Sequence, residues 1–114
     1  MPMKRLLIPL FLVLMGASGD PLQCDVGPIN KTYGAAPWLV YSCRDGKSVV
    51  IVSAPGSPAM PFYFMFAAEG ASYRLVGEGT GSKEVTDRVL VELKALRNED
   101  IVALVRQTQA AAKH

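Results

Sequence analysis

The stretch from Trp38 to Ser53 constrains the fold of this chain more than any other part of the sequence. Two runs rich in β-branched and aromatic residues flank the dipeptide Asp45-Gly46. Asp-Gly supplies the positive φ angles of a type I′ turn and the flanking residues favour strands, so the stretch predicts a tight β-hairpin. The hairpin contains the sole Trp and one of the two cysteines, Cys43, which makes it the expected centre of the fold.

The first residues carry the pattern of a signal peptide. Residues 1–19 begin with Lys4 and Arg5, continue with an apolar run and end in small residues, so we expect cleavage with Asp20 as the new N-terminus. The alternative is an uncleaved anchor, but the apolar run is shorter than the roughly 20 residues that cross a bilayer. A lipid on Cys24 is not expected, because polar residues separate it from the apolar run. The chain is therefore predicted to be periplasmic or secreted, without a membrane span after cleavage.

Residues 20–37 are rich in Pro, Gly and Asn and lack helical or strand periodicity, so they predict an irregular N-terminal arm. Cys24 lies in this arm. In an oxidising compartment a pair of cysteines favours a disulfide, and we expect one between Cys24 and Cys43. These cysteines and the terminal His114 do not supply the four ligands of a structural zinc site, so no metal and no other cofactor is predicted.

Residues 38–114 predict a single domain. Strands are expected on both sides of Asp45-Gly46, then in residues 62–68 and 73–78, and helical periodicity follows in residues 83–97 and 99–111. The predicted fold class is α+β, with a four-stranded antiparallel meander, two C-terminal helices packed on one face and one disulfide.

The strand at residues 62–68 is apolar on both sides. Phe62, Phe64 and Phe66 alternate with Tyr63 and Met65, so neither face of the sheet is suited to water. One pair of helices covers one face only. The second face must be covered by the N-terminal arm, by curling of the sheet or by another protein.

Two loops stand out by composition. Residues 54–61 contain three prolines and predict a stiff connection between two strands, with a contact surface as the second interpretation. Residues 77–83 are rich in glycine, but they match neither the Walker nor the dinucleotide spacing. They predict a flexible strand-to-helix connection with Ser82 as the N-cap.

The charged residues exclude some classes of function. The chain has 12 basic and 10 acidic residues, and removal of the leader with Lys4 and Arg5 leaves 10 of each, so no basic surface for nucleic acid is predicted. Nucleophilic catalysis lacks a base, because His114 is terminal, and the adjacent Ser82 and Lys83 point in different directions. The acidic residues weighed as catalytic pairs fall in turns or at strand ends, where they are expected to be solvated: Asp25, Asp45, Glu69 and Glu78. The sequence therefore favours a non-enzymatic binding protein.

Three motifs are similar to those of a known family. The hairpin sequence from Val40 to Gly46 resembles the Tyr-x-Cys-x-x-Gly signature of the bacterial periplasmic and membrane-bound inhibitors of C-type lysozyme. Residues 69–75 resemble the Asp-Gly-x-x-Tyr-x-Leu hairpin of that family, and residues 79–83 stand where it has a Ser-Gly-containing loop. In the family the hairpin cysteine pairs with a cysteine near the C-terminus, whereas here the partner is Cys24.

The resemblance implies a small β-fold that blocks a lysozyme active site by inserting a loop. It assigns partner binding to Thr80, Gly81, Ser82 and Lys83, with the two hydroxyls and the Lys83 charge directed at catalytic carboxylates. The predicted function is a small exported inhibitor-like protein whose partner is a lysozyme-type cell-wall hydrolase. The alternative is a structural or assembly subunit of the bacterial envelope that forms a homodimer or docks through its second sheet face.

Overall fold

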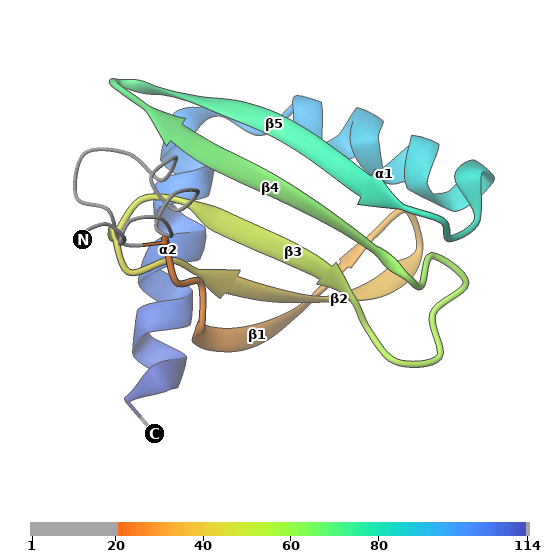
Figure 1. Cartoon of the computed structure of the whole chain (residues 1–114), viewed down its shortest axis with the longest axis horizontal. Coiled ribbons are helices and arrows are strands. Elements are labelled where there is room, and N and C mark those ends of the chain that lie inside the picture. Colours follow the sequence, from red (N-terminus) through yellow and green to blue (C-terminus); the bar gives the residue numbers. More distant parts are fainter. Residues whose placement is uncertain (1–20, 114) are drawn as a thin grey trace, which may run out of the picture.

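The computed structural model describes residues 21–113, which form one antiparallel sheet followed by two helices (Figure 1). The predicted signal peptide lies outside the described residues. The strands pair in chain order, and both helices lie on one side of the sheet. The elements are β1 (Val26–Tyr33), β2 (Ala36–Ser42), β3 (Val49–Ser53), β4 (Phe62–Glu69), β5 (Ser72–Gly79), α1 (Lys83–Lys94) and α2 (Asn98–Ala112). The α+β class, the antiparallel meander and the two C-terminal helices are confirmed.

The number of strands is five and not the predicted four. The additional strand, β1, lies inside residues 20–37, the segment predicted to be an irregular arm. It pairs with β2 from Ile29 opposite Val40 to Tyr33 opposite Ala36, with a register shift near its start. Its side chains do alternate between half-buried and exposed, but Pro and Gly conceal this pattern in the sequence. Pairing with β2 and packing against α2, rather than local propensity, hold this edge strand in place.

The two-residue turn of the sheet lies in a different hairpin from the one predicted to contain it. Between β2 and β3 only Gly46 has a positive φ, 71°, so the expected two-residue turn at Asp45-Gly46 is wrong. The connection has six residues, and the Asp45 carboxylate organises it by accepting hydrogen bonds from the backbone N–H groups of Lys47 and Ser48. The two-residue turn with positive φ at both central positions joins β1 to β2, at Gly34 and Ala35, each with φ of 59°.

The hydrophobic core lies between the sheet and the helices. Trp38 and Phe64 from neighbouring parts of the sheet are fully buried, with ring centroids 5.7 Å apart. From the helices, every third or fourth residue points into this core, as the periodicity of the sequence predicts. The core residues are Ala36, Trp38, Val40, Val49, Ile51, Ala59, Phe64, Phe66, Val85, Val89, Leu93, Ile101, Leu104 and Val105.

The segment before β1 is joined to the loop after β2 by three adjacent links. Cys24 and Cys43 form the predicted disulfide. The Arg44 N–H donates to the carbonyl of Gln23 over 2.7 Å, and the Arg44 guanidinium donates to both carboxylate oxygens of Asp25. The guanidinium hydrogen bonds hold the pKa of Asp25 below its usual range. The chain therefore enters the sheet from a fixed point.

Candidate protein-binding site

The face of the sheet that points away from the helices, called the open face below, is covered by no helix or strand of residues 21–113. One of the three expectations was that the N-terminal arm covers this face. The arm does not cover it, because its strand β1 extends the sheet at its edge. Strand register aligns its side chains in three rows. The first is Leu39, Val52, Tyr63 and Glu78, the second is Tyr41, Val50, Met65 and Val76, and the third is Ala67 and Arg74. The first two rows are largely apolar and yet accessible to solvent.

A groove of about 460 Å³ lies at the end of the open face, beyond the first row. Its floor is apolar, and it runs between the proline-rich loop of residues 54–61 and the start of the connection from β5 to α1. Met60, half of whose surface is exposed, forms part of one wall. The lining residues are Val52, Ser53, Met60, Pro61, Phe62, Tyr63, Glu78, Gly79 and Thr80.

The proline-rich loop is anchored on the core side. Ala59 is fully buried in the core, and its N–H donates to the Ser57 hydroxyl. The Ser53 hydroxyl accepts a hydrogen bond of 3.1 Å from the N–H of Phe62, and this bond joins the two ends of the loop. These contacts attach the loop to the core at Ala59 and to the end of β3 at its base.

The glycine-rich connection is attached to the proline-rich loop by backbone hydrogen bonds. The N–H groups of Thr80 and Gly81 both donate to the carbonyl of Pro61, and the N–H of Ser82 donates to the carbonyl of Pro58. A Cβ atom on Gly81 would overlap the backbone of Ala59, so glycine is required there by close approach. The connection that was predicted to be flexible thus makes three backbone hydrogen bonds to the proline-rich loop, and Gly81 allows the two backbones to touch.

The four residues predicted to bind a partner occupy different environments. Thr80 is exposed and lines the groove, whereas Gly81 is partly buried in the contact between the loops. Ser82 occupies the predicted N-cap position of α1, but its side chain makes no capping hydrogen bond. Lys83 begins α1, and its ammonium group lies 3.1 Å from the Asp87 carboxylate. Of the four, Thr80 is the residue that the fold places in the groove.

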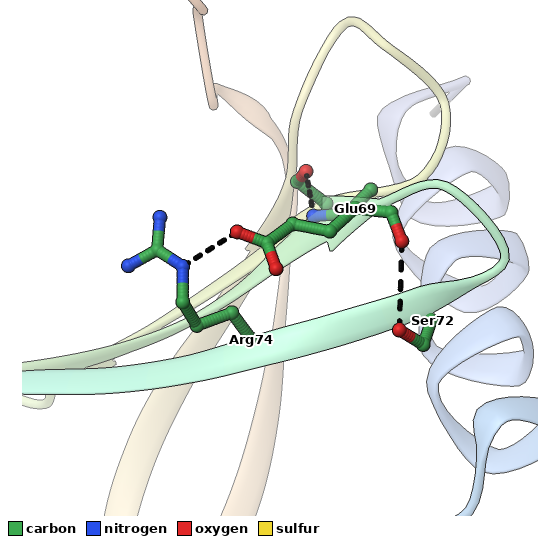
Figure 2. A network of polar contacts seen from close by, with 5 residues as sticks. Glu69, Ser72 and Arg74 are labelled. Carbon is green, nitrogen blue, oxygen red and sulfur yellow. Dashed lines mark hydrogen bonds and ion pairs between the residues drawn. The ribbon is translucent and has the colours of Figure 1, made fainter.

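Two polar pairs mark the ends of the open face on β4 and β5. Beside the groove, the Tyr63 hydroxyl donates to the Glu78 carboxylate over 3.1 Å, which raises the pKa of Tyr63. At the other end, Figure 2 shows the Glu69 carboxylate reaching back along the hairpin to the Arg74 guanidinium, with Nε and Oε2 2.7 Å apart. An apolar strip centred on Met65 lies between the two pairs.

The four carboxylates that the sequence singled out do not form one site. Asp25 pairs with Arg44, Asp45 caps a turn, and Glu69 and Glu78 belong to the two pairs at opposite ends of the β4–β5 hairpin. Among residues 21–113 no group of three or more His, Cys, Asp or Glu side chains could hold a metal ion. Neither helix in that part of the chain is long and apolar enough to cross a membrane.

Several groove residues were not identified from the sequence. Met60 and Pro61 belong to a loop that the sequence favoured as a simple connection, and Tyr63 and Glu78 lie in different strands. The signal available in the sequence was the apolar character of both sides of residues 62–68. It indicates an uncovered sheet face, but it does not locate the groove at the end of that face. Comparison with protein-family models, with curated proteins and with solved structures finds no match to this chain.

Proposed function

We propose that this chain is a small exported binding protein, without catalytic activity of its own, that contacts another protein through the groove and its two attached loops. The single observation that supports this most is the attachment of residues 79–82 to the proline-rich loop, which holds Thr80 and Met60 beside an apolar groove. The sharpest form of the proposal, motivated by the resemblance in residues 38–83, is inhibition of a lysozyme-type cell-wall hydrolase.

Rigidity favours this use of the loops. Binding with a loop that is already fixed loses less conformational entropy than binding with a loop that must be ordered. The groove supplies apolar area, and the Thr80 hydroxyl at its rim supplies a polar contact.

Lys83 can contribute charge to the same contact. Its ion pair with Asp87 joins two exposed side chains within one turn of α1, and such a pair stabilises a helix by only about 0.3–0.5 kcal/mol. The ammonium group can therefore exchange Asp87 for a carboxylate of the partner at little cost. This is the chemistry that an inhibitor of a carboxylate-dependent hydrolase requires.

Export is part of the proposal and rests on two observations. Residues 1–19 have the signal-peptide pattern, and the Cys24–Cys43 disulfide is compatible with an oxidising compartment. Periplasmic or extracellular location would place the protein where it meets cell-wall hydrolases.

The test is inhibition of a C-type lysozyme that clears a suspension of bacterial cell walls. The full sequence is expressed, the processed protein is purified in its oxidised form, and the clearing rate is followed at increasing molar ratios. We expect stoichiometric inhibition by the wild type. The triple variant Thr80→Ala/Ser82→Ala/Lys83→Ala should lose inhibition at least about tenfold, equivalent to about 1.4 kcal/mol of binding free energy.

A matched control separates this contact from a general effect of truncation. Thr32→Ala/Lys94→Ala removes a hydroxyl and a charge from exposed positions outside the groove and should inhibit like the wild type. Thermal unfolding of both variants should stay close to that of the wild type. Undiminished inhibition by the triple variant would remove residues 80–83 from the contact, and no inhibition at large molar excess of wild type would remove lysozyme as the partner.

The second candidate is a structural or assembly subunit of the bacterial envelope that dimerises or docks through its second sheet face. The observation in its favour is the apolar open face, which residues 21–113 leave accessible. The two forms of this candidate differ in oligomeric state: a self-associating protein forms a dimer in solution, whereas one that docks on another envelope component is monomeric by itself.

A further inference from the structure

We propose that the open face pairs with the open face of a second copy of this chain, around a two-fold axis that crosses the strands at the row of Met65. The inference rests on the second candidate function, which it makes specific, and does not need the inhibitor function. The interface includes Tyr63 and Glu78 at the edge of the groove and leaves residues 80–83 at the outer ends of the dimer.

The register of the sheet defines what such an axis would bring together. Rotation about a line that lies between the two sheets and crosses the strands places each strand over the same strand of the second copy, with its direction reversed. With the axis on the Met65 row, Met65 faces its own copy. The row of Tyr63 then faces the row of Ala67 of the second copy, and the reverse contact follows by symmetry.

The shapes of the side chains match in this arrangement. Strand β4 presents Tyr63, Met65 and Ala67 to the open face, which are a large, a medium and a small residue in sequence. The two-fold axis on Met65 places each tyrosine ring over an alanine. Alternation of large and small side chains across facing positions is how two sheets interdigitate in a sandwich.

The charges match on the neighbouring strand. Glu78 lies beside Val76 on one side and Arg74 lies beside it on the other, so the same axis brings Glu78 against Arg74 of the second copy. Glu78 is hydrogen-bonded to the neutral Tyr63 hydroxyl, and Arg74 is paired with an exposed carboxylate, so both can form the new contact. An axis parallel to the strands would place β5 over β1 and would not bring this acid to this base. Shape and charge thus select the same axis independently.

The size of the face fits a dimer that exchanges with its monomer. Strands lie about 4.8 Å apart and advance about 3.3 Å per residue, so five strands of this length offer roughly 500 Å² of sheet per copy. Two copies would bury roughly 1,000 Å², which is the lower limit for a specific interface. We therefore expect association that depends on concentration.

The experiment is sedimentation equilibrium of the processed wild-type protein over a wide micromolar range. Arg74→Glu places an acid against Glu78 of the second copy, and Glu78→Arg places a base against Arg74 of the second copy. Each variant should raise the dissociation constant at least about tenfold. The double variant Arg74→Glu/Glu78→Arg restores opposite charges and should return the constant to near the wild-type value. Met65→Lys places two ammonium groups at the axis and should also give monomer.

Arg106→Glu is the matched control, because it reverses an exposed charge on α2, on the other side of the sheet. It should dimerise like the wild type. Circular dichroism and thermal unfolding establish that each variant is folded. A wild type that is monomeric at every concentration overturns the proposal, as does a dimer that Arg74→Glu and Met65→Lys leave intact. If the double variant does not recover the dissociation constant of the wild type, the proposed position of the two-fold axis is wrong.

The two proposals fail separately. Arg74 does not line the groove of its own copy, so the folded, monomeric Arg74→Glu variant should inhibit lysozyme at least as well as the wild type if the inhibitor function is real. A dimer without lysozyme inhibition refutes the proposed function alone, and lysozyme inhibition by a strict monomer refutes the dimer alone.

Discussion

Thr108→Val tests how helix α2 is fastened to the sheet. Thr108 and Ser42 lie 66 residues apart in sequence, both are fully buried, and their hydroxyl oxygens are 2.7 Å apart. The Thr108 oxygen also lies 2.7 Å from the carbonyl of Val105, in its own helix. The assignment that satisfies both hydroxyls has Thr108 donating to Val105 and Ser42 donating to Thr108.

The magnitude follows from this assignment. Valine has nearly the volume of threonine, so Thr108→Val leaves no cavity but deprives the buried Ser42 hydroxyl of its acceptor, which costs about 1–3 kcal/mol. Ser42→Ala leaves Thr108 bonded to Val105 and should cost about 1 kcal/mol. The double variant leaves no buried hydroxyl unpaired at Ser42. Its loss should therefore be clearly smaller than the sum of the two single losses.

The assay is urea unfolding of the four proteins in the cycle, monitored by Trp38 fluorescence and circular dichroism. Thr86→Val is the control, because Thr86 is also buried but its hydroxyl contacts only the carbonyl of Lys83 in its own helix, at 3.3 Å. This control should lower the free energy of unfolding by about 1 kcal/mol or less, because it removes one hydrogen bond and leaves no buried hydroxyl unpaired. Equal losses for Thr108→Val and Thr86→Val, or strict additivity in the cycle, would refute the proposed hydrogen bond between helix and sheet.

The remaining predictions concern the groove wall and the β2–β3 turn. Gly81→Ala should lower the free energy of unfolding by about 1–3 kcal/mol, because its Cβ would push the backbone of Ala59 away. Thr80→Ala, at the neighbouring exposed position, should change the free energy of unfolding little. Equal melting temperatures for the two variants would contradict the close packing of the loops. For Asp45, burial raises the pKa, but hydrogen bonds from the Ser48 N–H and hydroxyl and from the Lys47 N–H outweigh it, so the net pKa is lowered. Its stabilisation should be present above the unfolded-state pKa of about 3.9 and be lost as the pH falls through the lower folded-state pKa. Wild type should therefore lose more stability than Asp45→Asn in acid urea titrations, and parallel curves would contradict this role.

Much of the fold follows from local signals in the sequence. The spacing of Val85, Val89 and Leu93 predicts α1, and the apolar alternation around Phe64 predicts an interior strand, because side-chain burial has the period of the backbone in each case. The disulfide follows from having two cysteines in a chain with an export pattern. The candidate site is predicted in part, since Thr80 was identified but its neighbours in the groove were not.

The errors have a common cause. Strand β1 has weak local propensity, and it forms because β2 offers a row of hydrogen-bonding groups beside it. Asp45-Gly46 has the composition of a type I′ turn, but the Asp45 side chain stabilises a wider loop, and the tight turn forms at Gly34-Ala35, beneath α1. In both cases the structure follows contacts that the local composition does not show: β1 pairs with β2 and packs against α2, and the Asp45 side chain bonds to Lys47 and Ser48.

The sequence by itself determined the types and the order of the elements after residue 38, the cysteine pair and the apolar character of both sheet faces. Only the tertiary structure decided which face is covered, that the glycines at 79 and 81 allow close contact with another loop, and that Tyr63 and Glu78 lie beside Thr80. The physical reason is the range of the interactions. Periodicity and turn chemistry act over a few residues, whereas a groove and an open face arise from packing between segments whose relative position no local pattern encodes.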